Sequence, residues 1–200
     1  ESNTLYRPYS EKTARVIDNL GPADSPGAFS ALAIAENDIP HVFDEQTIAE
    51  TDGLKVPPAK GRSDMRALPF VTIDGADARD FDDAVLAKPL EGGGWEIRVA
   101  IADVSYYVRP GSALDAEARK RGNSVYLPDR VVPMLPEALS NDLCSLRPNE
   151  PRAAMVAIIT MDEDGDVTSH SFERALIRSA ARLTYDKVQA WHEGGMTAEE

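Results

Sequence analysis

The chain has 200 residues, of which 42% are hydrophobic, and this is enough for the core of one domain, or of one domain with a smaller attachment. Its formal net charge of −13 at pH 7 and its pI of about 4.7 argue against a domain that binds nucleic acid through a broad basic surface. An enzyme that handles phosphates through bound cations is still compatible with this charge, because a divalent ion reverses the local sign of the potential.

The single cysteine, Cys144, excludes an internal disulfide and favours a reducing cytoplasm. Its context, SNDLCSL at residues 140–146, favours a small buried apolar side chain over a reactive thiol. No run of residues approaches the ~18 apolar residues of a membrane span. The first residues carry neither an initiator Met nor a signal-peptide pattern. We therefore expect a cytoplasmic fragment of a longer protein, without a membrane or disulfide partner.

The first third of the chain, residues 1–67, favours helical and irregular structure. We expect three helices there, over residues 11–20, 27–37 and 45–50. Ser10 is placed to cap the first of them and Asp44 the third, since both residue types accept hydrogen bonds from the first helical turn. Residues 53–64, GLKVPPAKGRSD, carry two prolines and little periodicity, and this is typical of a linker.

The pattern changes to strands after Pro69. We expect consecutive antiparallel strands over residues 70–74, 83–88 and 95–108, with a glycine turn at 91–94 before the last of them. In that last strand Trp95, Ile97, Val99 and Ile101 alternate with polar and small residues. This alternation predicts that these four side chains form a buried face.

The rest of the chain mixes both kinds of element. Residues 112–122 predict a helix that begins after Ser112 and ends at Gly122. Residues 124–146 are broken by prolines, and residues 152–179 predict a long hairpin that turns at 163–166. A last helix is expected after Thr184, over residues 185–193.

Residues 72–85, TIDGADARDFDDAV, hold five aspartates between Asp74 and Asp83. Two carboxylates about 4 Å apart repel by roughly 4 kcal/mol at an effective dielectric near 20. Neither a strand nor a helix would aim all these side chains at one point, so the segment must curl. A curled loop of carboxylates is what Mg²⁺ requires, because this ion takes oxygen ligands and can share a substrate phosphate. Two such ions about 3.5–4 Å apart can assist phosphodiester cleavage.

Two other interpretations of acidic segments stay open. A solvated turn between strands also collects aspartates, and a calcium loop is a further option. The spacing D-x₂-D-x₂-D-x-D-D does not match the EF-hand pattern with its closing Glu. The stretch DEDGD at 162–166 looks closer to a calcium loop, but it lies between two alternating strands and is better interpreted as a hairpin turn.

Three long stretches carry a resemblance to a known family, and they occur in the right order. They are LPFVTIDGADARDFDDAV at 68–85, the run from VAIADVSYYV to SNDLCSL at 99–146, and ALIRSAARLTYDKV at 175–188. Over residues 60–190 the chain resembles the ribonuclease II/ribonuclease R family, and its acidic stretch looks more like the ribonuclease R branch. The resemblance implies an α+β fold with a sheet-rich core, and a Mg²⁺-dependent, processive 3′-to-5′ exoribonuclease. Such an enzyme threads the 3′ end of single-stranded RNA to a buried site and releases nucleoside 5′-monophosphates.

The same resemblance implies the site residues. Asp74, Asp80, Asp82 and Asp83 match the aspartates that hold the metal and orient the attacking water, whereas Asp77 does not match and is expected to be solvated. Tyr126 matches a residue that packs against the terminal nucleotide. Stacking suits a site without sequence preference, because every base has a π-face. The three histidines match no ligand spacing.

The resemblance also implies how the chain is organised. Residues 1–58 would be a connector that follows absent N-terminal cold-shock-like domains. Residues 59–200 would be the N-terminal part of the ribonuclease (RNB) catalytic domain. A different class of function, a non-catalytic RNA-binding regulator on the same fold, would be expected to lose part of the aspartate set, and all four aspartates are present.

Overall fold

The structure, a computed structural model, describes residues 2–10 and 13–194, which belong to two compact units. The first unit combines Glu1–Glu50 with Pro110–Pro136, and the second combines Thr51–Arg109 with Glu137–Glu200. The chain therefore passes from the first unit into the second, returns to the first at Pro110 and enters the second again at Glu137. No helix in the described part of the chain has the length and apolar character that crossing a bilayer demands.

The first unit consists of a long hairpin, a short hairpin and three helices. Its elements are β1 (Ser2–Ser10), β2 (Thr13–Pro22), α1 (Ala28–Glu36), α2 (Glu45–Ala49), α4 (Ala113–Arg121), β7 (Val125–Tyr126) and β8 (Val131–Val132). Two of the predicted caps are confirmed. The Asp44 carboxylate accepts the backbone N–H of Thr47 at 2.6 Å, and the Ser112 hydroxyl accepts that of Asp115 at 3.1 Å.

The helix predicted over residues 11–20 is wrong where the structure describes it. Residues 13–22 form β2, which pairs antiparallel with β1 from Ser2↔Pro22 to Ser10↔Thr13, while residues 11 and 12 lie outside the described residues. Strand pairing satisfies the backbone groups of both segments, and the β-branched residues of this stretch suit a strand. Such a pairing overrides local helix propensity. The second predicted helix is confirmed as α1.

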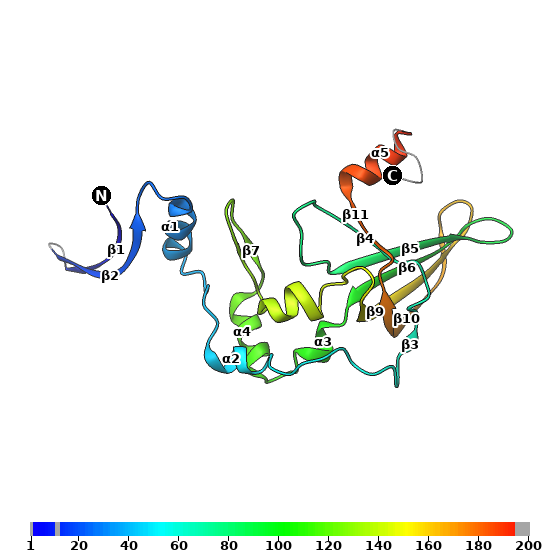
Figure 1. The fold of residues 1–200 in the computed structure, drawn as a ribbon, viewed down its shortest axis with the longest axis horizontal. Helices are drawn as coiled ribbons and strands as arrows, with labels where there is room; N and C mark the ends of the chain where they lie inside the picture. Colours follow the sequence, from blue (N-terminus) through cyan, green and yellow to red (C-terminus); the bar gives the residue numbers. More distant parts are fainter. Residues whose placement is uncertain (1, 11–12, 195–200) are drawn as a thin grey trace. The chain divides into compact units, whose positions relative to one another are not determined.

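The second unit is built on a seven-stranded mixed sheet (Figure 1). Its strands are β3 (Ser63–Asp64), β4 (Val71–Asp74), β5 (Asp83–Pro89), β6 (Trp95–Ala102), β9 (Pro151–Met161), β10 (Val167–Arg178) and β11 (Ala181–Thr184). Their order is β11-β4-β5-β6-β9-β10-β3. The five inner strands are antiparallel, whereas β11 and β3 join the two edges in parallel. The remaining elements are α3 (Val104–Tyr107), the π-helix η1 (Leu139–Leu143) and α5 (Tyr185–His192). The α+β class is confirmed.

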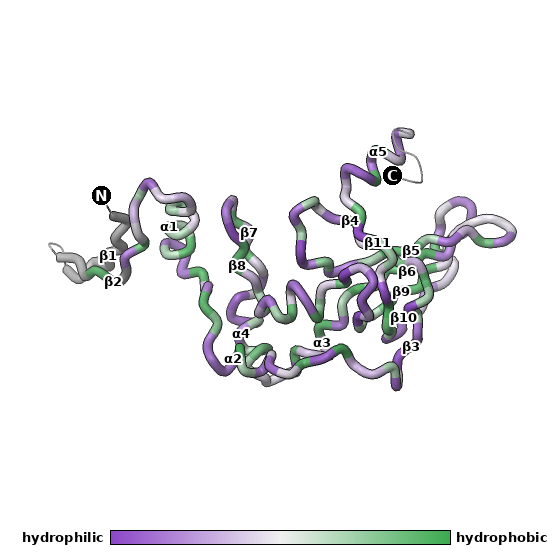
Figure 2. Tube along the Cα trace, viewed as in Figure 1, coloured by the Kyte–Doolittle hydropathy of each residue, from purple (hydrophilic) through white to green (hydrophobic). Residues whose placement is uncertain are grey.

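The buried face of this sheet is the opposite of the predicted one. Ala84, Ala100 and Val156 lie opposite one another on β5, β6 and β9, and all three are 0% exposed. On the other face, Trp95 and Ile101 of β6 are 50% and 47% exposed. Figure 2 shows hydrophobic residues along these strands. The larger apolar side chains of β6 lie on the more exposed face, so the alternation of hydrophobicity predicted the wrong face.

The hairpin predicted over 152–179 is confirmed as β9 and β10. In its turn the Asp162 carboxylate accepts the N–H groups of Asp164 and Asp166, so this acidic stretch is a hairpin turn, as predicted. The strand predicted over 95–108 ends at Ala102, and α3 follows it. The last predicted helix is confirmed as α5, which begins after Thr184.

Candidate active site

The acidic stretch forms a loop between adjacent antiparallel strands of the sheet. Asp74 is the last residue of β4 and Asp83 the first of β5, and residues 75–82 between them have no regular structure. We call residues 74–83 the acidic loop. The loop turns early, where the N–H of Ala78 reaches the carbonyl of Gly75 at 3.3 Å. The segment therefore turns between Gly75 and Ala78, whereas convergence of its carboxylates on one point stays a prediction.

The acidic loop is held at its second half by segments that are distant in sequence. Phe81 points inward and is only 6% exposed. Its N–H donates to the hydroxyl of Ser145 at 3.1 Å, and its carbonyl accepts the N–H of Leu146 at 2.8 Å. The carbonyl of Asp82 accepts the N–H of Ala102 at 2.9 Å. The backbone that carries Asp80, Asp82 and Asp83 is thereby tied to the core of the unit.

Arg182 on β11 holds the first half of the loop. Its guanidinium donates to the carbonyl of Gly75 at 3.2 Å and to that of Ala76, and it lies over the ring of Phe81 at 5.1 Å from the centroid. A guanidinium suits this task because it donates in several directions and stacks on aromatic rings. The positive charge also lies beside a strongly negative loop.

The four predicted aspartates interact electrostatically. Although Asp82 is exposed as a residue, the protein around its carboxyl restricts solvent, and this desolvation is the main reason that its pKa is raised. The charges of Asp80, Asp83 and Asp74 raise the pKa of Asp82 further, in that order. At Asp82, therefore, both desolvation and repulsion by the neighbouring carboxylates disfavour the charged form. A hard cation is the natural counter-charge for such a set.

The side chains are not arranged as a finished metal site. Within residues 2–10 and 13–194, no group of three or more His, Cys, Asp or Glu side chains is placed to hold a metal ion. One carboxylate is turned to its own backbone, since Asp74 accepts the N–H of Gly75 at 2.7 Å. The donor chemistry and the shared charge of the four aspartates fit Mg²⁺, and their side chains would have to turn toward one another to bind it. Asp77, in the same loop, is exposed.

Tyr126, the predicted base-stacking residue, belongs to the first unit. It ends the short strand β7, pairs with Val131 of β8 and is 67% exposed. By contrast, Tyr107 is 5% exposed and packs edge-to-face on Tyr106. The exposed ring of Tyr126 is thus suited to contact a ligand rather than to fill the core.

Sequence reasoning missed the residues that hold the loop. Ser145 and Arg182 lie 64 and 106 residues from their hydrogen-bond partners Phe81 and Ala76. Nothing in the local pattern around either residue indicates such a contact. Only the mixed sheet, with β11 parallel to β4, brings Arg182 to the loop.

Comparisons with known proteins agree with this fold. The family model for the RNB domain matches residues 62–200. Ribonuclease R of Vibrio cholerae is 52% identical to this chain over 184 residues, which are 90% of this chain and 22% of that protein. Among solved structures, Mycoplasma genitalium RNase R in complex with ribose methylated single-stranded RNA superposes with a TM-score of 0.86 at 34% identity. It covers 92% of this chain and 29% of that one. The chain therefore belongs to the RNB-domain family.

Two further findings limit what can be concluded about activity from membership of this family. The chain spans less than a quarter of the length of the Vibrio cholerae relative. The yeast protein Ssd1, a pseudonuclease, also shares the fold, with a TM-score of 0.76 at 18% identity over 98% of this chain and 26% of that one. The fold alone consequently does not decide activity, and the residues of the acidic loop must decide it.

Proposed function

We propose that this chain is part of a Mg²⁺-dependent exoribonuclease that degrades single-stranded RNA processively from its 3′ end and releases nucleoside 5′-monophosphates. One observation carries the proposal: the four aspartates lie in one loop that residues distant in sequence hold in place, and the charges of the other three raise the pKa of Asp82. The relatives named Ribonuclease R and the RNA complex of the Mycoplasma protein support it.

In this proposal Asp74, Asp80, Asp82 and Asp83 bind the metal and orient the attacking water. Bound Mg²⁺ would supply stabilisation of the charge that develops on the phosphate and would lower the pKa of water. The loop itself contributes position, because its backbone is fixed at Phe81 and Asp82. A carboxylate of this set accepts a proton from the attacking water, whose oxygen forms a bond to the phosphorus. The bond from the phosphorus to the 3′ oxygen of the preceding nucleotide breaks, and that oxygen takes up a proton and leaves as a hydroxyl.

Tyr126 serves binding rather than chemistry. A base stacked on its exposed ring gains about 1–3 kcal/mol whatever its identity, which suits an enzyme that degrades RNA without sequence preference. The net charge of −13 disfavours a general attraction for RNA, and we therefore propose that this attraction comes from other parts of the parent protein. We propose accordingly that residues 1–58 connect RNA-binding domains to residues 59–200, the first part of the catalytic domain, in a cytoplasmic enzyme.

The test is Asp82→Asn in the full-length protein, with release of labelled nucleoside monophosphates from a uniformly labelled single-stranded RNA as the readout. Several kcal/mol of lost transition-state stabilisation correspond to roughly a thousandfold lower kcat. RNA affinity, measured by fluorescence anisotropy, should change by less than about threefold, because the variant removes one negative charge and no RNA-binding group.

Asp77→Asn is the matched control. It makes the same change in the same loop at an exposed aspartate outside the proposed set, so kcat should stay near the wild-type value. Chelation of Mg²⁺ should stop the wild type and leave RNA binding intact. An active Asp82→Asn variant would refute the site. A wild type that binds RNA but releases no monophosphate with Mg²⁺ would instead favour the non-catalytic regulator.

A further inference from the structure

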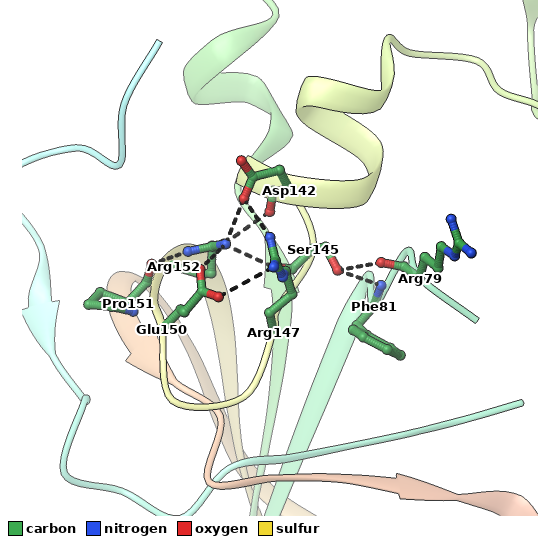
Figure 3. A network of polar contacts seen from close by, with 8 residues as sticks. All are labelled: Arg79, Phe81, Asp142, Ser145, Arg147, Glu150, Pro151 and Arg152. Carbon is green, nitrogen blue, oxygen red and sulfur yellow. Dashed lines mark hydrogen bonds and ion pairs between the residues drawn. The ribbon is translucent and has the colours of Figure 1, made fainter. Parts of the chain in front are cut away.

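Ser145 makes an unusual use of its hydroxyl at the acidic loop. The residue is 0% exposed, and its hydroxyl donates to the carbonyl of Arg79 at 2.8 Å while it accepts the N–H of Phe81 at 3.1 Å (Figure 3). These two backbone groups belong to the residues on either side of Asp80. One side chain thus bridges the backbone around a proposed metal ligand, using both its donor and its acceptor capacity.

The neighbouring residue completes this contact. The N–H of Leu146 donates to the carbonyl of Phe81 at 2.8 Å. Three backbone groups of residues 79–81 are thereby satisfied by two residues of another segment, where no strand runs alongside. Phe81 is held inward, with the half-buried Asp80 and the exposed Asp82 on either side of it.

Ser145 is itself fixed by a buried arginine. The Nε of Arg152 donates to the carbonyl of Ser145 at 2.9 Å and to that of Asp142 at 3.0 Å (Figure 3). Arg152 is only 4% exposed, and its remaining nitrogens bond the Pro151 carbonyl and the carboxylates of Asp142 and Glu150. The guanidinium on β9 therefore fixes the backbone of Ser145, and with it the position of the hydroxyl.

We infer that Ser145 is a positioning residue for the proposed metal site: its hydroxyl fixes the backbone on both sides of Asp80, so that the carboxylates of the acidic loop need only turn their side chains, and not move their backbone, to share a divalent cation. This inference rests on the proposed function of the loop. Without the bridge, the mutual repulsion of the aspartates would let the loop open, and metal binding would then have to close it again. Loss of the hydroxyl should weaken metal binding and leave RNA binding unchanged.

The experiment compares Ser145→Ala with Ser179→Ala in the full-length protein. Ser179 is also buried, at 1% exposure, and its hydroxyl donates to the carbonyl of Ala181 rather than to the acidic loop. Mn²⁺ binding is measured by calorimetry without RNA, and the KM for RNA and the kcat are measured across a series of Mg²⁺ concentrations. Loss of two hydrogen bonds that favour the closed loop predicts Mn²⁺ affinity weaker by roughly tenfold or more in Ser145→Ala.

Further results would bear on the inference in distinct ways. Ser179→Ala should bind Mn²⁺ like the wild type, the KM for RNA should stay within about twofold in both variants, and higher Mg²⁺ should restore kcat in Ser145→Ala. Ser145→Thr keeps a hydroxyl and should recover part of the affinity. If Ser145→Ala does not fold, Ser145→Cys carries the test under reducing conditions, because a thiol of similar size is only a weak donor and acceptor.

The inference and the proposed function fail separately. A folded Ser145→Ala or Ser145→Cys variant with wild-type Mn²⁺ affinity would overturn the positioning role and leave the nuclease site intact. Equal loss of affinity in Ser179→Ala would also overturn it, since the effect would then be general to buried serines. A wild type that binds no Mn²⁺, or that binds it equally well after Asp82→Asn, would overturn the proposed site and the inference with it.

Discussion

The ion pair between Arg62 and Asp103 is buried more deeply than most, with side chains 5% and 0% exposed. Nη2 of Arg62 lies 2.6 Å from Oδ2 of Asp103, and the hydroxyl of Ser105 donates to Oδ1 at 2.7 Å. Burial by itself would raise the pKa of Asp103. The hydrogen bonds from Ser105 and Arg62, with the positive charges of Arg62 and Arg174, outweigh burial and lower the pKa.

Arg62→Met removes the cation and keeps a long apolar side chain, so the main loss is the partner of a buried carboxylate. Breaking such a pair from one side costs about 3–5 kcal/mol, and we expect this penalty in the free energy of unfolding at pH 7. The pKa of Asp103 in the variant would then lie above its unfolded value of about 3.9. The loss in free energy of unfolding is complete above the raised pKa, where the buried carboxyl is charged. It becomes smaller by about 1.4 kcal/mol per pH unit as pH falls from the raised pKa toward 3.9, because the carboxyl is then protonated in the folded state.

The wild type behaves in the opposite sense. Because the folded-state pKa of Asp103 is lowered, its stabilising contribution is complete above about pH 3.9 and is lost only as pH falls below that value toward the folded-state pKa. Between pH 7 and pH 4 the difference in free energy of unfolding between wild type and variant should therefore become smaller. The cause would be protonation of Asp103 in the variant, which removes its penalty, because the wild type loses no stability from Asp103 in this range.

Urea unfolding of the 200-residue chain, followed by tryptophan fluorescence at pH 7 and pH 5, measures both effects. Arg66→Met is the matched control, since Arg66 pairs with Asp64 at the same 2.6 Å but with side chains 42% and 53% exposed. An exposed pair of this kind contributes about 0–1 kcal/mol. The reasoning would be refuted if Arg62→Met cost no more than Arg66→Met, or if its penalty were identical at the two pH values.

Two further predictions concern a thiol and a helix cap. Burial raises the pKa of Cys144 to about 12, so the folded chain should not react with Ellman's reagent, and one thiol should appear on unfolding in guanidinium chloride; rapid reaction of the native chain would contradict this. Ser112→Ala removes the acceptor for the N–H of Asp115 and should cost about 1 kcal/mol in urea unfolding. Ser171→Ala, at an exposed strand position, is the comparison and should cost much less.

The elements that could be predicted from the sequence are those whose cause is local. Asp44, Ser112 and Thr184 cap helices because each side chain reaches an N–H three residues ahead, and a short motif shows this directly. The turn at 162–166 is likewise closed by its own residues. The four aspartates proposed for the site come from a resemblance between sequences, which transfers residue types, and their role stays a prediction.

What could not be predicted depends on segments that meet across the fold. Residues 13–22 became a strand because β1 lies beside them, and no property of the stretch alone specifies that partner. On β6 the large apolar residues lie on one face, yet the other face, with Ala100 and Ala102, is the buried one, because the rest of the unit covers that side. Ser145 looks like any loop serine until β9 places Arg152 against its carbonyl.

The two acidic turns of this chain differ in what holds them, and this difference bears on function. The turn at 162–166 is hydrogen-bonded among its own residues, which is enough for a solvated turn. The acidic loop at 74–83 is instead tied by Ala102, Ser145, Leu146 and Arg182, all from other elements of the same unit. Holding repelling carboxylates together from outside lowers stability unless a cation or an RNA phosphate uses them. A chain that needed only a polar connection between β4 and β5 could do without these contacts, and their presence therefore argues for a binding role of the aspartates that the turn at 162–166 does not share.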